Sequence, residues 1–417
     1  MLILRIGLAF ATFMGFAIGT AQAQEWSRFR GPNGDGINAA TTIPAEWKTS
    51  DFAWKIQLPG GGHSSPVLWG NKIFLTGSDR DGGARMIFCL NAADGKTLWS
   101  KTFTSSSYHI HVQNSFASGT PVCDAEAVYA AWATPEGGLL TAIDHDGQEK
   151  WRFELPGYES QHGFGSSPML VDDLVILTND QDGPSCVFAV NRTNGQLQWK
   201  IDRRVKPKQN ASYATPMLYR PKPGGPQQLI IHSWAHGMSS LDPATGKVHW
   251  EKEVFPKRPV GSPIVHAGLM LGNCGEGGGD NSVIAVIPPT SAEEEPKIKF
   301  TIDKTMAPYV PSLIAQDDLA YLWSDKGIVS CIRLPEGKKV WQQRVGGNYS
   351  TSPVIAGDKL IGVSADGEVV ILATGTKYEL LGRNKLEETT RATPAIAGGK
   401  LFVRTENRLF AIQGKTK

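Results

Sequence analysis

The segment Ser64–Phe103, SSPVLWGNKIFLTGSDRDGGARMIFCLNAADGKTLWSKTF, decides the fold. It predicts four short strands, separated by the turns Gly70-Asn71 and Asp94-Gly95 and by a polar loop. These strands are Ser65–Leu68, Ile73–Thr76, Met86–Leu90 and Thr97–Phe103. Short β-rich runs punctuated by Gly, Asn or Asp are typical of antiparallel hairpins. One such sheet cannot bury both of its faces, so the segment predicts neighbouring sheets of the same kind.

The first strand of this unit begins at a Ser-Pro or Thr-Pro pair that recurs along the chain. The pairs are Ser65-Pro66, Thr120-Pro121, Ser167-Pro168, Thr215-Pro216, Ser262-Pro263, Ser352-Pro353 and Thr393-Pro394. Val310-Pro311 supplies an eighth anchor, in which we expect the hydroxyl residue to be replaced. Repeats of 20–50 residues are typical of propellers and solenoids, so eight anchors at this spacing predict such an array.

The second half of the unit also recurs, as a polar turn with a glycine that is followed four residues later by a tryptophan. The glycine permits a positive φ in the turn, and the tryptophan brings a large apolar surface onto the neighbouring sheet. We therefore predict that these tryptophans dock the blades together. They are Trp99, Trp151, Trp199, Trp250 and Trp341, whereas Phe300 and Leu381 occupy the positions in the fifth and seventh copies.

The last unit has three predicted strands and lacks a fourth. An unpaired strand with Trp54, Phe52–Leu58, lies near the N-terminus and can complete it. Such closure removes the exposed sheet edges of a linear array. The sequence thus predicts an all-β, eight-bladed propeller of four-stranded antiparallel blades over residues 52–413. We expect residues 24–51, rich in Gly and Pro turns, to form a flap packed by Trp26 and Phe29.

Residues 1–23 have the features of a signal peptide: Arg5, an apolar stretch and the small residues around Gln22. We expect cleavage near Ala23, a periplasmic or secreted protein, and no membrane span, because the apolar run is short. The formal net charge of +2 is too balanced to favour nucleic acid as a partner. We expect a monomer.

Other polar and cysteine-containing segments predict structure rather than chemistry. The five cysteines are scattered and include no Cys-x-x-Cys, so we expect buried free thiols and not a zinc site. Four of them fall in predicted strands, with Cys274 outside. We expect the basic segment Arg203–Lys208 to be a solvated loop, and the polar segment Asn179–Gly183 to be a hairpin turn.

The repeat resembles the tryptophan-docking repeat of the pyrroloquinoline quinone (PQQ) type β-propellers. Leu241–Trp250, LDPATGKVHW, is the clearest copy, and the resemblance covers roughly residues 52–413. The N-terminal Trp26–Ile37, WSRFRGPNGDGI, and the later Ser212–Pro216, SYATP, resemble an exported, planctomycete-like subgroup. The resemblance implies a propeller fold. The superfamily includes quinoprotein alcohol and sugar dehydrogenases and a non-enzymatic scaffold of the outer-membrane assembly machinery.

Residues just before the strand anchors should surround one mouth of the central channel, where polar and aromatic residues gather. Convergent polar groups in a funnel make this mouth the candidate binding site. The candidate residues are His63, His109, His111, Asn114, His162, Tyr213, Tyr349 and Arg391.

Three functions fit such a mouth. His109 and His111, together with His63 or His162, are suitable metal ligands, but the spacing of the pair does not fix a third ligand, so no metal site is assigned. A PQQ-dependent alcohol or sugar dehydrogenase would need carboxylate and amide ligands for Ca²⁺ and an acidic base. The resemblance also implies that a quinoprotein alcohol dehydrogenase would carry two adjacent cysteines near its cofactor, and no two cysteines are adjacent in this sequence. We therefore favour a non-catalytic binding or scaffolding module for a protein, glycan or small molecule, with PQQ and Ca²⁺ as the alternative.

Overall fold

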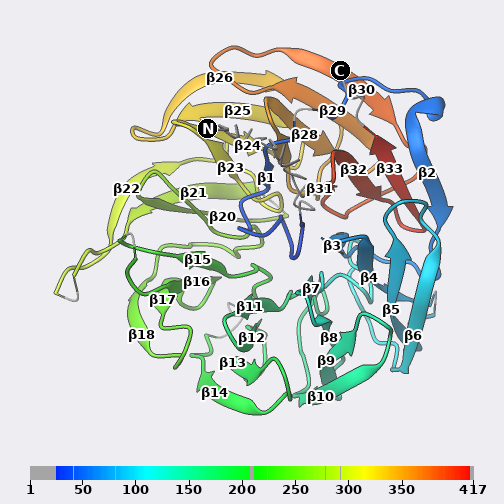
Figure 1. The fold of residues 1–417 in the computed structure, drawn as a ribbon. Helices are drawn as coiled ribbons and strands as arrows, with labels where there is room; N and C mark the ends of the chain where they lie inside the picture. The colour runs from blue at the N-terminus through cyan, green and yellow to red at the C-terminus, as the bar shows by residue number, and fades with distance from the viewer. Residues whose placement is uncertain are drawn as a thin grey trace, which may run out of the picture.

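The computed structural model describes residues 25–413, except residues 41, 80, 207–210, 223, 278 and 292. The predicted signal peptide and part of the basic segment lie outside the described residues. Eight antiparallel sheets form the blades of a propeller around a central channel (Figure 1). The predicted all-β, eight-bladed fold is confirmed. Within the described ranges, no helix is long and apolar enough to cross a membrane.

Each of the first seven blades follows the chain from its innermost to its outermost strand. Blades 1 and 2 are β3 (Val67–Trp69), β4 (Lys72–Ser78), β5 (Ala84–Asn91), β6 (Thr97–Thr104), β7 (Val122–Cys123), β8 (Ala127–Ala133), β9 (Gly138–Asp144) and β10 (Glu149–Leu155). Blades 3 and 4 are β11 (Met169–Val171), β12 (Leu174–Asn179), β13 (Cys186–Asn191), β14 (Leu197–Asp202), β15 (Met217–Tyr219), β16 (Gln228–Ser233), β17 (Gly237–Leu241) and β18 (Val248–Lys252).

The second half of the ring repeats this order. Blades 5 and 6 are β19 (Ile264–His266), β20 (Leu269–Glu276), β21 (Gly279–Ile287), β22 (Lys297–Ile302), β23 (Ile314–Gln316), β24 (Leu319–Trp323), β25 (Ile328–Arg333) and β26 (Lys338–Arg344). Blades 7 and 8 contain β27 (Val354–Ala356), β28 (Lys359–Val363), β29 (Glu368–Ala373), β30 (Leu380–Lys385), β31 (Ala395–Ala397), β32 (Lys400–Arg404) and β33 (Arg408–Gln413). A short 3-10 helix, η1 (Thr49–Asp51), precedes β2 (Phe52–Gln57).

The strand β2 closes the ring by pairing antiparallel with β33, with Trp54 opposite Ala411. The two strands lie side by side in Figure 1, blue beside red. This is the pairing that the sequence predicts. Phe88 of blade 1 and Phe402 and Phe410 of blade 8 are buried in one hydrophobic cluster, so apolar packing also joins the first and last blades.

The innermost strands start two residues later than the Ser/Thr-Pro anchors suggest. The predicted strand Ser65–Leu68 is observed as β3, which begins at Val67, because Pro66 has no N–H to give to a ladder. Cys274 lies in β20, contrary to its predicted position outside a strand. All five cysteines are buried and free, and burial raises the pKa of Cys89 to about 12.

The indole groups of the outer strands contact the turns of the following blades. Five indole N–H groups donate to a backbone carbonyl there: Trp54 to Ala92 (3.2 Å), Trp99 to His145 (3.0 Å), Trp151 to Arg192 (2.7 Å), Trp199 to Pro243 (3.0 Å) and Trp341 to Gly375 (3.0 Å). The Trp250 indole N–H is buried without a partner among the described residues. It precedes blade 5, whose turn contains Pro288-Pro289 and no glycine.

The segment from Trp26 to Asn38 lies across the centre of the propeller, where Figure 1 shows it in dark blue. Trp26 is fully buried and pairs with Leu68 of blade 1. The buried guanidinium groups of this segment extend to blades on different sides of the channel. Their Nη2 atoms donate to carbonyl oxygens, Arg28 to Pro216 and Arg30 to Leu313, both at 2.6 Å.

The same segment then joins the wall of the channel. Its strand β1 (Ile37–Asn38) adds to blade 7 as a parallel partner of β27. The Asn38 amide donates to the carbonyl oxygen of Ile396 in blade 8 at 3.0 Å. The N-terminal segment therefore contacts innermost strands all around the ring.

Candidate functional site

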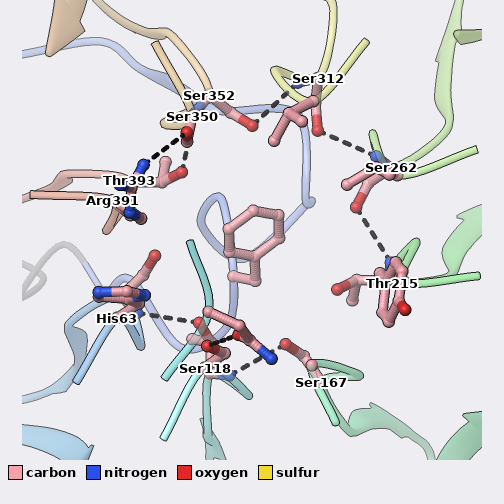
Figure 2. A pocket seen from close by; sticks show the side chains of 18 of the residues that line it. His63, Ser118, Ser167, Thr215, Ser262, Ser312, Ser350, Ser352, Arg391 and Thr393 are labelled. Carbon is pink, nitrogen blue, oxygen red and sulfur yellow. Dashed lines mark hydrogen bonds between the residues drawn. The ribbon is translucent and has the colours of Figure 1, made fainter. Parts of the chain in front are cut away.

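The hydroxyl residues of the strand anchors form a hydrogen-bonded ring around the channel (Figure 2). The backbone N–H of one anchor donates to the side-chain oxygen of the anchor in the next blade. Six such bonds join Ser65 to Thr120, Thr120 to Ser167, Thr215 to Ser262, Ser262 to Ser312, Ser312 to Ser352, and Ser352 to Thr393, at 2.9–3.1 Å. The hydroxyl group at six of the eight anchors thus links neighbouring blades, which explains why it recurs with the repeat.

Blade 6 keeps its ring hydroxyl, contrary to the expectation at Val310-Pro311. Ser312 occupies the ring position, and the proline lies one residue before it instead of one residue after. The sequence prediction aligned the repeats by their prolines. In the structure, the equivalent positions are those of the hydroxyl oxygens in the ring. The prediction of a lost hydroxyl in this blade was therefore wrong.

A cavity of about 230 Å³ opens above this ring. All eight anchor residues line it and take part in the hydrogen-bonded ring as donors or acceptors, and Phe29 of the N-terminal segment reaches it across the channel. Its remaining walls are mainly polar and aromatic, with His63, Gln113, Asn114, Ser118, His162, Tyr213, Tyr309, Ser350 and Arg391, and they also include Gly165, Val260 and Val310. Polar groups from many blades therefore converge on one small volume, as the sequence predicts for a channel mouth.

Aromatic and amide contacts hold one side of the mouth together. The ring centroids of His111 and His162 lie 4.7 Å apart, and those of His162 and Tyr213 lie 6.0 Å apart. Asn114 Nδ2 donates to the His162 carbonyl oxygen at 2.5 Å. Burial, with Arg258 and His111 nearby, lowers the pKa of His162 to about 4. His162 is therefore neutral at neutral pH.

The adjacent side of the mouth is positively charged. Burial and the positive charges of Arg404 and Arg391 lower the pKa of His63 to about 3. Arg404 is fully buried, and its Nη1 atom donates to the backbone oxygens of Ser64 and Thr76 at 3.0 and 2.9 Å. Arg391 lines the cavity and donates to Ser350 Oγ at 3.3 Å. Two guanidinium groups thus lie close to a neutral imidazole.

The eight candidate residues from the sequence divide into three groups. Five line the cavity: His63, Asn114, His162, Tyr213 and Arg391. His111 contacts the His162 ring behind the lining, and His109 is exposed to solvent. Tyr349 is buried against Trp323, with ring centroids 5.1 Å apart, and does not line the cavity.

Phe29 and the ring hydroxyls are site residues that the sequence did not predict. The repeated Ser/Thr at the anchors was visible in the sequence, but its position suggested a strand start and not a cavity wall. Phe29 gave no such signal, because only the tertiary structure brings the N-terminal segment to the channel.

The donor set of the cavity does not fit a calcium-bound quinone. Its lining, within the described chain, contains no Asp or Glu. Ca²⁺ is bound through carboxylate and carbonyl oxygens, and alcohol oxidation at such a site needs a general base. Over the same described residues, no group of three or more His, Cys, Asp or Glu side chains is arranged to hold a metal ion.

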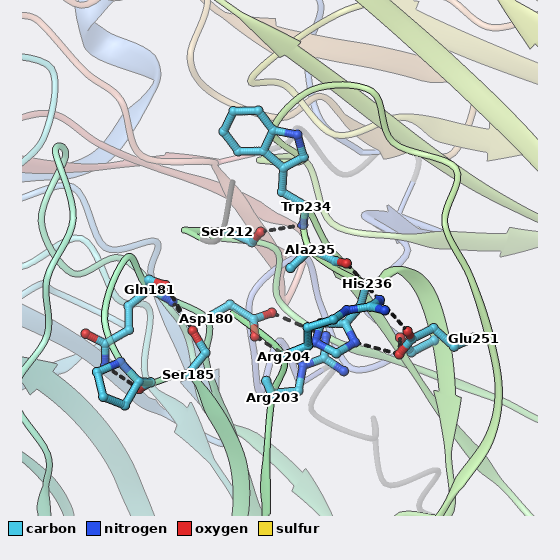
Figure 3. A network of polar contacts seen from close by, with 12 residues as sticks. Asp180, Gln181, Ser185, Arg203, Arg204, Ser212, Trp234, Ala235, His236 and Glu251 are labelled. Carbon is cyan, nitrogen blue, oxygen red and sulfur yellow. Dashed lines mark hydrogen bonds and ion pairs between the residues drawn. The ribbon is translucent and has the colours of Figure 1, made fainter. Parts of the chain in front are cut away.

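A second polar cluster lies beside the mouth, on blades 3 and 4 (Figure 3). The side chains of Arg203 and Asp180 are 2% and 3% exposed and form an ion pair at 3.2 Å. Arg204 pairs with Glu251 at 2.9 Å, and His236 Nδ1 lies 2.6 Å from Glu251 Oε2. The prediction of a solvated loop was therefore wrong at Arg203. The segment Asn179–Gly183 does lie in the predicted hairpin turn, between β12 and β13, and it also supplies the buried partner Asp180. The loops meet here as buried partners.

Sequence comparison supports the family. A family model described as outer membrane protein assembly factor BamB matches residues 84–270 and 325–416, about two thirds of the chain. A curated BamB from Alkalilimnicola ehrlichii is 26% identical over 143 residues. This match covers 34% of this chain and spans only 33% of the relative's length.

Solved structures show the same fold at low sequence identity. BamB from Moraxella catarrhalis has a TM-score of 0.62 and 16% identity, over 87% of this chain and 97% of that one. Quinohemoprotein alcohol dehydrogenase from Comamonas testosteroni has a TM-score of 0.64 and 12% identity, over 94% and 81%. The family match and the eight blades with their recurring anchors agree. The chain belongs to the PQQ-like repeat β-propeller family described as outer membrane protein assembly factor BamB.

Proposed function

We propose that this protein is an exported, monomeric, non-catalytic binding or scaffolding module that takes its ligand or partner at the channel mouth. The observation that carries this proposal is the cavity itself, in which polar and aromatic groups converge and the described lining residues include no carboxylate. A relative named as an assembly factor supports a scaffolding function for the family.

The alternative is a PQQ-dependent alcohol or sugar dehydrogenase. The fold of this chain is compatible with that function, since a quinohemoprotein alcohol dehydrogenase has a similar fold. A shared fold does not carry over an active site, and the cavity lining lacks an acidic base. The two neutral histidines of the mouth do not replace the carboxylate ligands of Ca²⁺.

A dehydrogenase would reduce a dye in the presence of its substrate, whereas a binding module would not. Purified protein is incubated with PQQ and Ca²⁺, and dye reduction is followed with a panel of alcohols and sugars. We expect no turnover above that of the Gly165→Trp variant. In this variant the cavity is filled: a Cβ on Gly165 has its nearest contact at 3.6 Å, to Tyr213. Saturable dye reduction by the wild type that Gly165→Trp abolishes would overturn the proposal.

A matched variant controls for the added tryptophan. Gly83 also has its nearest contact at 3.6 Å, to Asp79, and does not line the cavity. Gly83→Trp should behave as the wild type in every binding measurement. In a thermal-shift screen of small molecules and glycans, ligands of the mouth should stabilise the wild type and Gly83→Trp, but not Gly165→Trp.

A further inference from the structure

The cavity contains more hydrogen-bond donors than the protein itself uses. Six ring hydroxyls each accept a backbone N–H: Thr120, Ser167, Ser262, Ser312, Ser352 and Thr393. None of these hydroxyls donates its own proton to an acceptor within the described part of the chain. A hydroxyl that accepts a hydrogen bond is polarised and becomes a better donor. The ring therefore presents several O–H donors to whatever occupies the channel.

Positive charge at the mouth is not neutralised by carboxylates. Arg391, Arg258 and Arg404 have no ion-pair partner among the residues that the structure describes, in contrast to the paired Arg203 and Arg204. The Arg258 guanidinium lies over the Trp234 ring, 5.4 Å from its centroid. Since an unpaired charge in a partly buried site is costly, an anionic ligand would lower the energy of this arrangement.

One acidic group beside the mouth, Asp325, already has hydrogen-bond partners in the protein. Asp325 accepts hydrogen bonds from the backbone N–H groups of Tyr309 and Val310, at 2.7 and 3.0 Å. Burial raises its pKa above the ordinary value for an aspartate. Asp325 therefore serves the loop before blade 6 and is not part of the cavity lining.

Size and shape restrict the ligand further. A volume of about 230 Å³ corresponds to about eight water molecules, which is the size of a monosaccharide. Phe29, Tyr213 and Tyr309 give the cavity apolar faces on which a ring can pack. One lining guanidinium matches the single charge and planar oxygen pair of a carboxylate better than a phosphate dianion.

We infer that the cavity binds a small, carboxylate-bearing molecule of the sugar-acid class without a metal ion. Its carboxylate lies against Arg391, and its other oxygens accept hydrogen bonds from the hydroxyl ring. This inference rests on the proposed function, because it names the ligand of the same mouth.

The experiment uses isothermal titration calorimetry on the purified protein in EDTA, with glucuronate and galacturonate as probes. Glucose and galactose are the matched neutral sugars, and inorganic phosphate is a third probe. We expect at least one uronate to bind at least about tenfold more tightly than its neutral sugar, as the loss of one charged hydrogen bond predicts. Binding should weaken as salt concentration rises.

Two variants locate the carboxylate. Arg391→Gln should weaken uronate binding about tenfold or more, because it removes the charge and retains a hydrogen-bonding side chain. Arg220→Gln, at an exposed arginine outside the cavity, is the control and should bind as the wild type. Unchanged thermal unfolding of Arg391→Gln in the absence of ligand shows that the variant is folded.

Several outcomes would overturn the inference: no uronate binding up to about 10 mM, equal affinity for the neutral sugars, tighter binding of phosphate, a requirement for Ca²⁺, or unchanged affinity in Arg391→Gln. These outcomes are distinct from failure of the proposed function. If another compound of the screen binds the wild type and not Gly165→Trp, a binding module remains and only its ligand class changes. Quinone-dependent turnover would instead contradict the binding module itself.

Discussion

At the scale of single residues, a buried imidazole within blade 4 stays neutral. His232 is fully buried beside Phe255, with ring centroids 4.9 Å apart, and neither of its ring nitrogens has a hydrogen-bond partner in the described structure. Burial lowers its pKa from 6.5 to about 3. The unfolded chain therefore protonates His232 at a much higher pH than the folded state does.

This histidine makes the stability of the protein depend on pH. Its folded pKa is below the unfolded value of 6.5, so its contribution is complete above about pH 6.5 and is lost as pH falls toward 3. As pH falls through this window, the free energy of unfolding should decrease less steeply in His232→Leu than in the wild type. The two slopes should differ by about 1.4 kcal/mol per pH unit. Urea unfolding at several pH values measures both slopes. Equal slopes in wild type and variant would contradict the burial of a neutral His232.

At the scale of elements, four blades dock onto the next through a tryptophan that packs on a turn glycine: Trp54 on Gly95, Trp99 on Gly147, Trp151 on Gly195 and Trp199 on Gly246. Gly195, in the turn before β14, has a φ of 73°, and an added Cβ would lie 2.7 Å from Trp151 Cε3. Gly268, between β19 and β20, has a nearly equal φ of 75° with no atom within 4 Å of the added Cβ. A comparison of substitutions at these two positions therefore separates the energy of backbone strain from the energy of blade docking.

Alanine at these two positions tests the docking contact. Both substitutions place a Cβ at positive φ and should cost a similar backbone energy. Gly195→Ala also displaces the Trp151 ring, so it should lower the free energy of unfolding by a further 1–3 kcal/mol or so, in the range of overpacked cores. Chemical denaturation compares the two variants with the wild type. If Gly268→Ala were equally destabilising, the tryptophan contact would contribute little.

At the scale of the whole molecule, the N-terminal segment connects blades that are distant around the ring. Arg30 is fully buried and donates to the carbonyl oxygens of Leu313 and Asp35 at 2.6 and 3.1 Å. Burial lowers the pKa of Arg30 to about 10, which leaves it charged at neutral pH. The side chain holds the segment against blade 6 and fills space within the channel.

Removal of this side chain should weaken the whole ring. Arg30→Ala leaves the Leu313 carbonyl without this donor and creates a cavity, so we expect a loss of about 2–4 kcal/mol. The exposed Arg220→Ala should change stability by less than about 0.5 kcal/mol. Calorimetry should show a single transition at lower temperature. An unchanged transition temperature would show that the segment only rests on the propeller.

Much of the architecture was predictable because repetition makes local signals add up. The recurring glycine turns and the docking tryptophans indicated eight blades, and the lone strand containing Trp54 indicated how the ring closes. Strand starts were less accurate: β3 begins at Val67 because Pro66 cannot join the ladder. The hydroxyl of blade 6 was misplaced because Pro311 occurs one residue out of register with Ser312.

The sequence by itself determined the repeat, the blade order and five of the residues that line the mouth, since these follow from local periodicity. Only the tertiary structure decided that the anchor hydroxyls form a ring, that Phe29 reaches the channel and that Arg203 pairs with Asp180. The physical reason is sequence separation. The recurring Ser/Thr of the anchors is a periodic signal, but it does not reveal that residues about 50 positions apart share a hydrogen bond. A buried guanidinium bonded across the ring leaves no periodic signal at all, because its partner is chosen when the blades close.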